Sequence, residues 1–220
     1  AYPPTVTIRV QPHSVGIFFG SEDDFSIDVV PAIPWANGQY LVPESSHMSV
    51  ANRRMYYKSA PVLTWIKSDP KGYIDQAAKL DAQTQGRFRK AAKFIKKWRV
   101  GCKDISEMFP LKSFHTEIIV TERLKMQPKI SVLAAVEVFF DIVNTTIIHP
   151  QYPDKADATQ YIDQYVSELT QTQRRLVVEE QERAQQLLAQ MRPANTDAQI
   201  LLSIEELLRA KQLHPTPIIH

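Results

Sequence analysis

The chain has 220 residues, enough to bury a hydrophobic core in one large domain or in two closely packed lobes. Its composition, 44% hydrophobic and 23% charged, excludes a disordered or fibrous protein. The formal net charge of +2 gives no argument for a nucleic-acid partner, so any electrostatic binding surface must be local. The single cysteine, Cys102, excludes an intrachain disulfide and a cysteine-based zinc site, and it fits a reducing cytoplasm.

Neither the N-terminal residues nor the most apolar stretch of the sequence suggests a membrane protein. Residues 1–4 lack the basic start and apolar stretch of a signal peptide. The most apolar long window, residues 130–148, carries Glu137 and Asp141 and predicts a core helix rather than a membrane span. We therefore expect a cytoplasmic protein with no membrane partner. The chain starts at Ala1 and enters a strand pattern almost at once, which is what a fragment of a longer protein would show.

Residues 5–30 have the alternation of β-strands. Val6, Ile8 and Val10 alternate with polar or charged neighbours, and two apolar runs follow at residues 14–19 and 25–30. The connection at residues 20–24 is rich in turn formers. This pattern predicts a three-stranded antiparallel meander.

The third of these strands carries one carboxylate, Asp28, in an otherwise apolar run. In an extended strand Phe25, Ile27 and Val29 share one face, and Asp28 lies on the other. We expect this strand to be buried, so Asp28 requires a metal ion, a hydrogen-bond network or a basic partner. An Asp at a strand edge, bonded to loop backbone, explains the same residues equally well.

Residues 31–70 are rich in Pro, Gly, Asn and Ser and predict a long loop with short strands near residues 40–42 and 62–66. The loop is somewhat basic at Asn52-Arg53-Arg54 and Lys58, for which solvated charge is the more common explanation.

Helical spacing begins after Asp69-Pro70 and continues, after a short break, from Phe88 to Trp98. The second of these helices is crowded with Lys and Arg, and Lys90, Lys93 and Lys97 fall on one face. Such a face is either simply solvated or binds a polyanion such as a triphosphate, for which Lys and Arg are the natural donors.

Further helices are predicted in the rest of the chain. One begins near Ser113, which suits a helix N-cap, and another spans residues 131–146 with one buried side. Residues 156–191 predict one or two long polar helices, and a last amphipathic helix covers residues 197–211. The break between these two lies at residues 192–195.

The order of these motifs resembles the bacterial cyclic-oligonucleotide synthases of anti-phage defence, the CD-NTases. These are relatives of cyclic GMP–AMP synthase in the polymerase-β-like nucleotidyltransferase superfamily. The resemblance covers residues 5–150, and its most specific piece is the run Ile-Asp-Val-Val-Pro-Ala at residues 27–32. The other pieces are Gly-Gln-Tyr-Leu-Val-Pro-Glu at 38–44, Trp65 with Ser-Asp-Pro at 68–70, the basic helix ending Phe-Ile-Lys-Lys-Trp at 94–98, and Ser113-Phe114.

The resemblance implies an α+β fold, in which a remnant antiparallel meander of the nucleotidyltransferase core packs on a C-terminal helical lobe. Residues 1–70 would belong to the core and residues 71–220 to the nucleotide-binding lobe. By this resemblance Asp28 is the counterpart of the family's third metal-binding carboxylate, which binds Mg²⁺ or Mn²⁺ and takes part in catalysis. The basic helix and the Ser-aromatic pair of the family hold the donor nucleotide. By position this implicates one or more of Arg89, Lys90 and Lys93, together with Ser113.

The sequence also departs from the family. Its first two carboxylates come from an Asp-x-Asp strand after a Gly-Ser helix start, and here Gly20-Ser21 is followed only by Asp23-Asp24 in a turn. Two-metal phosphoryl transfer needs several carboxylates around ions about 4 Å apart. We therefore expect this chain alone to be inactive, and a missing N-terminal segment or a second chain to complete it.

The expected function is the joining of nucleoside triphosphates, ATP or GTP, into cyclic or linear oligonucleotide messengers. Two other interpretations stay open: a non-catalytic nucleotide-binding or regulatory module, and an α+β scaffold whose basic helix binds nothing specific. We also expect the edge of the strand at residues 5–10 to pair with another chain, because an exposed edge leaves backbone groups unpaired.

Overall fold

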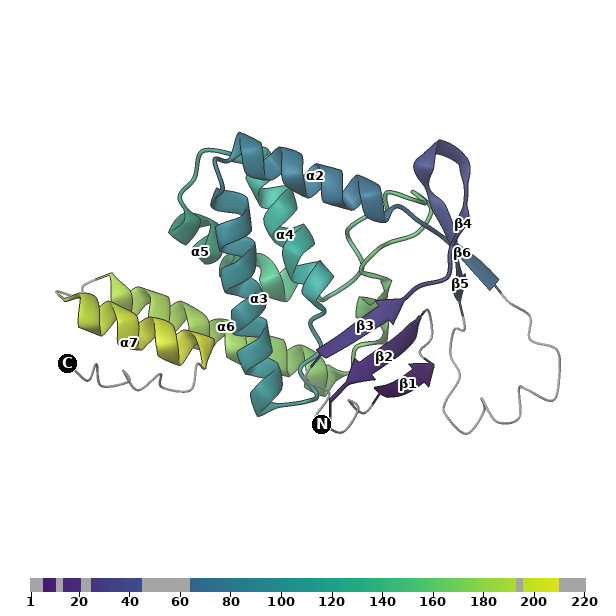
Figure 1. Ribbon diagram of the computed structural model, residues 1–220. Coiled ribbons are helices and arrows are strands. Elements are labelled where there is room, and N and C mark those ends of the chain that lie inside the picture. The colour runs from purple at the N-terminus through teal and green to yellow at the C-terminus, as the bar shows by residue number, and fades with distance from the viewer. Residues whose placement is uncertain (1–5, 11–13, 21–24, 45–63, 193–195, 210–220) are drawn as a thin grey trace, which may run out of the picture. The chain divides into compact units, whose positions relative to one another are not determined.

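The computed structural model describes residues 6–10, 14–20, 25–44, 64–192 and 196–209 (Figure 1). In these ranges the chain forms two three-stranded antiparallel sheets and six α-helices, which confirms the α+β prediction. The chain divides into two compact units. The first comprises Ala1–Tyr73 with Lys155–Asp157, and the second comprises Ile74–Asp154 with Ala158–His220.

The first sheet is the predicted meander. Its strands are β1 (Val6–Val10), β2 (Val15–Phe19) and β3 (Phe25–Val29), paired antiparallel in the order β1-β2-β3. The register places Ile8 opposite Ile17 and Ile17 opposite Ile27. Directly opposed residues point to the same side of a sheet, so these three isoleucines form one row across it.

The prediction that β3 is buried is wrong for this chain. Every residue of β3 is exposed, including Phe25 at 59% and Ile27 at 44%, and Ile8 on β1 is 67% exposed. The physical reason is that a single sheet cannot bury its own apolar face and requires a second layer of structure. The apolar face of the meander, formed by the rows of Ile8 and Phe25, therefore stays in contact with solvent.

The second sheet follows in the same unit. Its strands are β4 (Ile33–Pro34), β5 (Tyr40–Glu44) and β6 (Thr64–Ser68), in the order β4-β5-β6, and β5 and β6 confirm the short strands predicted there. A 3-10 turn, η1 (Ala36–Gly38), joins β4 to β5. Segment Lys155–Asp157 belongs to this unit, since Lys67 forms an ion pair with Asp157 at 3.5 Å. Residues 45–63, which include Asn52-Arg53-Arg54 and Lys58, lie outside the described residues.

The helices confirm most of the predicted helical segments. They are α2 (Pro70–Gln83), α3 (Arg87–Ile105), α4 (Ser113–Met126), α5 (Val132–Thr146), α6 (Gln171–Met191) and α7 (Asp197–Leu208). The predicted helix start at residue 156 is wrong. Residues 154–169 are irregular apart from the 3-10 helix η2 (Gln164–Glu168), and α6 begins where Thr170 and Gln173 form a capping box.

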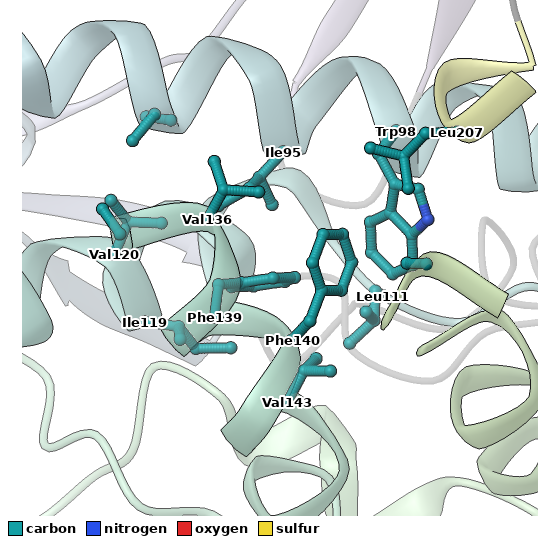
Figure 2. Close-up of a cluster of buried hydrophobic side chains, with 14 of the residues drawn as sticks. Ile95, Trp98, Leu111, Ile119, Val120, Val136, Phe139, Phe140, Val143 and Leu207 are labelled. Carbon is teal, nitrogen blue, oxygen red and sulfur yellow. The ribbon is translucent and has the colours of Figure 1, made fainter. Parts of the chain in front are cut away.

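The core of the second unit is built around an aromatic cluster (Figure 2). Trp98 of α3 is fully buried, and the edges of neighbouring rings meet it at centroid distances of 5.6 Å for Phe109, 5.8 Å for Phe139 and 4.9 Å for Phe140. α5 thus faces the core as predicted, and the apolar stripe of α3 points inward with it. Over the ranges listed above, none of the helices combines the length and apolar character needed to cross a membrane.

Candidate functional site

Asp28 lies in the middle of β3, on the polar side of the meander. The register places it opposite Gly16, which in turn lies opposite Arg9, so these residues form one row across the sheet. The guanidinium group of Arg9 is 4.3 Å from the centroid of the Phe18 ring, which lies in the next row. Asp28 is exposed. Its exposure removes the desolvation cost on which the predicted need for a compensating partner depended.

The residues that the structure describes do not by themselves form a metal centre. They contain no group of three or more His, Cys, Asp or Glu side chains placed to hold an ion. Asp28 supplies one carboxylate, whereas hard divalent ions are held by several oxygen ligands. The donor set in this part of the chain is therefore incomplete for Mg²⁺.

The basic side chains of α3 between Arg87 and Arg99 fall into two groups. Four of them are bonded to neighbouring parts of the protein and help to hold the helix in place. These pairs are Arg87 with the carbonyl oxygen of Pro128 (3.1 Å), Arg89 with Asp81 (3.4 Å), Lys96 with Glu117, and Arg99 with the carbonyl oxygen of Leu111 (2.5 Å).

The second group is the lysine face, Lys90, Lys93 and Lys97. All three side chains are exposed, and within the described ranges none forms an ion pair or hydrogen bond with another side chain. The buried stripe of α3, which runs from Phe88 to Cys102, fixes them on the opposite, solvent side of the helix. The structure thus separates Arg89, whose guanidinium already has a carboxylate partner, from Lys90 and Lys93, whose charges are available to an anion.

Ser113 is the first residue of α4 and is half-buried. It is not the N-cap, which is Lys112, so the expectation of a Ser113 cap is wrong. The first backbone N–H groups of a helix have no intrahelical acceptor, and they give this end partial positive charge. The structure places Ser113 at such an end, within the same unit as the lysine face.

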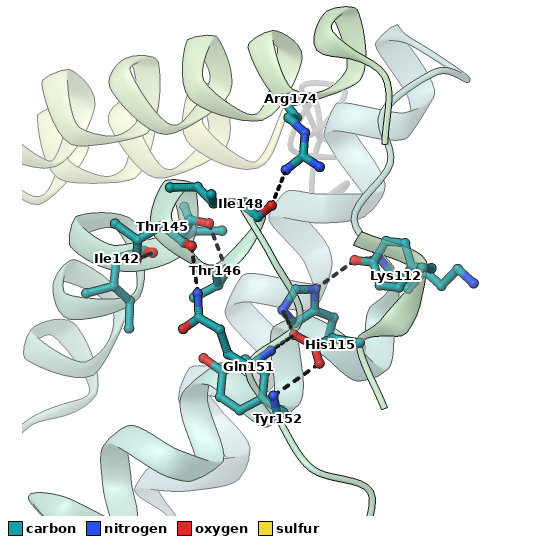
Figure 3. A network of polar contacts seen from close by, with 12 residues as sticks. Lys112, His115, Ile142, Thr145, Thr146, Ile148, Gln151, Tyr152 and Arg174 are labelled. Carbon is teal, nitrogen blue, oxygen red and sulfur yellow. Dashed lines mark hydrogen bonds and ion pairs between the residues drawn. The ribbon is translucent and has the colours of Figure 1, made fainter. Parts of the chain in front are cut away.

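A buried polar network next to Ser113 was missed by the sequence analysis (Figure 3). His115 is fully buried, with Nδ1 2.7 Å from the hydroxyl oxygen of Tyr165 and Nε2 3.8 Å from Oδ2 of Asp163. Asp163 is also fully buried, and its carboxylate accepts the N–H groups of Gln151 (2.9 Å) and Tyr152 (3.1 Å). His115 is visible in the sequence two residues after Ser113, but its partners lie about fifty residues further on, at the start of the short 3-10 helix η2.

Burial controls the protonation of this network. It lowers the pKa of His115 to about 4, because the loss of solvation outweighs the opposing effect of the Asp163 charge. The imidazole is therefore neutral near pH 7, and its contact with Asp163 is not an ion pair. Burial also raises the pKa of Tyr165 to about 12, so the phenol keeps the proton it can donate.

Comparison with known proteins rests on structure, since no protein-family model and no curated protein matches the sequence. The chain is similar to CdnC of Escherichia coli MS115-1 in its complex with HORMA-deltaN, with a TM-score of 0.68, 13% identity and 92% of this chain covered. It is similar to Escherichia coli DncV bound to 3′-deoxy GTP, with a TM-score of 0.68, 16% identity and 92% coverage. It is also similar to Vibrio cholerae DncV, a cyclic AMP-GMP synthase solved with nonhydrolyzable GTP, with a TM-score of 0.66, 14% identity and 92% of this chain covered.

These similarities define the class of fold. The chain has the fold of the bacterial CD-NTases, the nucleotidyltransferase fold shared by CdnC and DncV. It spans 64% of the CdnC chain and about half, 51% and 52%, of the two DncV chains.

Proposed function

We propose that this chain is the C-terminal part of a divalent-metal-dependent nucleotidyltransferase, which joins nucleoside triphosphates into cyclic or linear oligonucleotide messengers in the cytoplasm. The single observation that carries this proposal is the fold shared with CdnC and DncV over 92% of the chain. Solved structures of those proteins contain ATP, GTP analogues and a linear pppA(3′,5′)pG intermediate. We also propose a role in anti-phage defence, which only the resemblance of the sequence motifs to the CD-NTases implies.

Asp28 is the proposed catalytic residue of this chain. Its carboxylate would be a general base or one ligand of Mg²⁺ or Mn²⁺, an ion that would supply charge stabilisation for phosphoryl transfer. The remaining ligands would come from a polypeptide segment outside the described residues. Support comes from its position at the centre of β3, on the polar side of the meander.

The lysine face and the start of α4 would bind the donor nucleotide. Lys90 and Lys93 are the favoured contacts for the triphosphate, because they are exposed and their charges have no carboxylate partner in the described ranges. Arg89 could contribute only by releasing or sharing Asp81. Ser113 would meet the nucleotide at the positive end of α4.

The apolar face and outer edge of the meander would bind the completing segment. In the described sheet β1 pairs only with β2, so its outer edge is available for another strand. The exposed row that contains Ile8 and Ile27 would be buried by a second layer. This segment, or a second chain, would supply the Asp-x-Asp carboxylates.

The test is Asp28→Asn in the complete protein, assayed for oligonucleotide product from ATP and GTP. We expect product to be lost while the melting temperature stays within a few degrees, because Asp28 is exposed and the substitution is isosteric. The matched control is Asp104→Asn, an exposed aspartate on α3, which should retain full activity. A folded Asp28→Asn variant that still makes product would refute the assignment.

A second candidate function is a nucleotide-binding module without catalysis. It is favoured by the combination of an available lysine face with a single proposed metal-binding carboxylate among the described residues. Titration of the complete wild-type protein with ATP would separate the two. Salt-sensitive binding with no product in the presence of Mg²⁺ would select the binding module.

A further inference from the structure

We propose that Tyr165 is a positioning residue for the start of α4, and that the buried His115 and Asp163 hold its hydroxyl group in place. The proposal rests on the proposed function, because this helix start carries Ser113. It assigns a role in nucleotide binding to a residue of η2 that lies about fifty residues from Ser113 in the sequence and touches no substrate itself.

The hydroxyl group of Tyr165 forms hydrogen bonds with residues on both sides of Ser113. It accepts the backbone N–H of Lys112 at 3.3 Å, and it lies 2.7 Å from Nδ1 of His115 (Figure 3). Lys112 is the last residue before the helix, and His115 lies in its first turn. One oxygen atom therefore fixes the position of the chain as it enters α4.

The ring of Tyr165 contacts the same segment. Its edge-to-face contact with the Phe114 ring has a centroid distance of 6.0 Å and an interplanar angle of 82°. The ammonium group of Lys112 lies 4.6 Å from the centroid of the Tyr165 ring. Among residues 112–115 of the described chain, Ser113 alone makes no hydrogen bond or ring contact with Tyr165. The Ser113 hydroxyl group is therefore not used in these contacts with Tyr165 and is available to a ligand.

The direction of the Tyr165 hydroxyl group is determined by the charge of Asp163. Nε2 of His115 is 3.8 Å from Oδ2 of Asp163, too far for a hydrogen bond but close enough to favour the imidazole proton on Nε2. Nδ1 is then an acceptor, so the Tyr165 O–H donates to it. The Tyr165 oxygen is left to accept the N–H of Lys112.

Asp163 is itself rigidly held. Its two carboxylate oxygens accept the backbone N–H groups of Gln151 and Tyr152, which ties the acid to the chain after α5. The rings of Tyr152 and Tyr165 meet the imidazole edge-on at 5.7 and 5.6 Å. The acid, the imidazole and the phenol thus form one continuous support behind the start of α4.

The test compares Tyr165→Phe with Tyr152→Phe in the complete protein. Both substitutions remove one hydroxyl group from the same cluster, but the Tyr152 hydroxyl bonds to neither Lys112 nor His115. We expect Tyr165→Phe to weaken ATP binding about threefold to tenfold, the effect of one or two hydrogen bonds. Backbone amides of residues 112–116 should exchange faster. Tyr152→Phe should change ATP affinity by no more than about twofold.

A third variant, Ser113→Ala, separates this proposal from the proposed function. If Ser113→Ala weakens ATP binding while Tyr165→Phe and Tyr152→Phe behave alike, the positioning role is refuted and the nucleotide site stands. If Ser113→Ala leaves ATP affinity unchanged, the nucleotide contact and the positioning role are both refuted. Equal melting temperatures of the two Tyr→Phe variants, together with a loss of affinity in Tyr165→Phe alone, would exclude a merely structural effect.

Discussion

The meander and the helical unit differ in how far their large apolar side chains are buried. In the helical unit, Trp98, Phe139 and Phe140 are completely buried against one another. In the meander, Ile8, Phe25 and Ile27 remain largely exposed on one face. Helices can surround a core by themselves, whereas a single sheet buries a face only when a second layer covers it. The helical unit thus buries its large apolar side chains among its own helices, whereas the described strands of the meander leave theirs exposed, and the proposed completing segment would cover them.

The largest expected effect is in the aromatic core. Trp98→Ala should destabilise the helical unit by about 3–5 kcal/mol, because it removes a buried indole and leaves a cavity among three rings. Urea denaturation followed by circular dichroism would measure this loss. Trp65→Ala on the exposed surface of β6 is the matched control, and it should cost no more than about 1 kcal/mol. Similar losses for the two variants would contradict the contrast between the units.

The next effect concerns pH. His115 is neutral in the fold because burial lowers its pKa to about 4, whereas the unfolded chain binds a proton near pH 6.5. Its contribution to stability is therefore complete above pH 6.5 and is lost as pH falls toward 4, by about 3 kcal/mol. The titratable groups that face it are Asp163, Tyr152 and Tyr165.

Urea denaturation between pH 7.5 and pH 4 would measure that dependence. His115→Gln should flatten the curve in this window, since no imidazole remains to be protonated on unfolding. His149→Gln, which changes an exposed histidine after α5, should leave the curve unchanged. An identical pH dependence in the His115→Gln variant would show that another group is responsible.

The smallest effect is expected on the meander. Ile27→Lys should change the stability of this chain by no more than about 0.5 kcal/mol, because the side chain is already exposed. Ser26→Lys, on the opposite face of the same strand, is the matched control. In the complete protein Ile27→Lys should instead be strongly destabilising, since a covered face would bury the new charge. A large loss in this isolated chain would mean that the face is already covered.

Local patterns in the sequence determined much of the fold. Alternating residues predicted β1, β2 and β3, and helical periodicity predicted α2, α3 and α5 with the buried side of α5. The motif order around Asp28 and the basic helix predicted the CD-NTase fold. The start of α6 also has a local sequence signal, because Thr170 and Gln173 have the spacing of a capping box.

Only the tertiary structure decided which of these residues are buried, paired or available. The pairing of Arg89 with Asp81 distinguishes it from Lys90 and Lys93, although all three have the same chemistry in the sequence. The support of Ser113 by His115, Asp163 and Tyr165 joins segments about fifty residues apart. Periodicity reports the geometry of one strand or helix at a time. Burial, hydrogen-bond partners and pKa depend on contacts between distant segments, which no local pattern records.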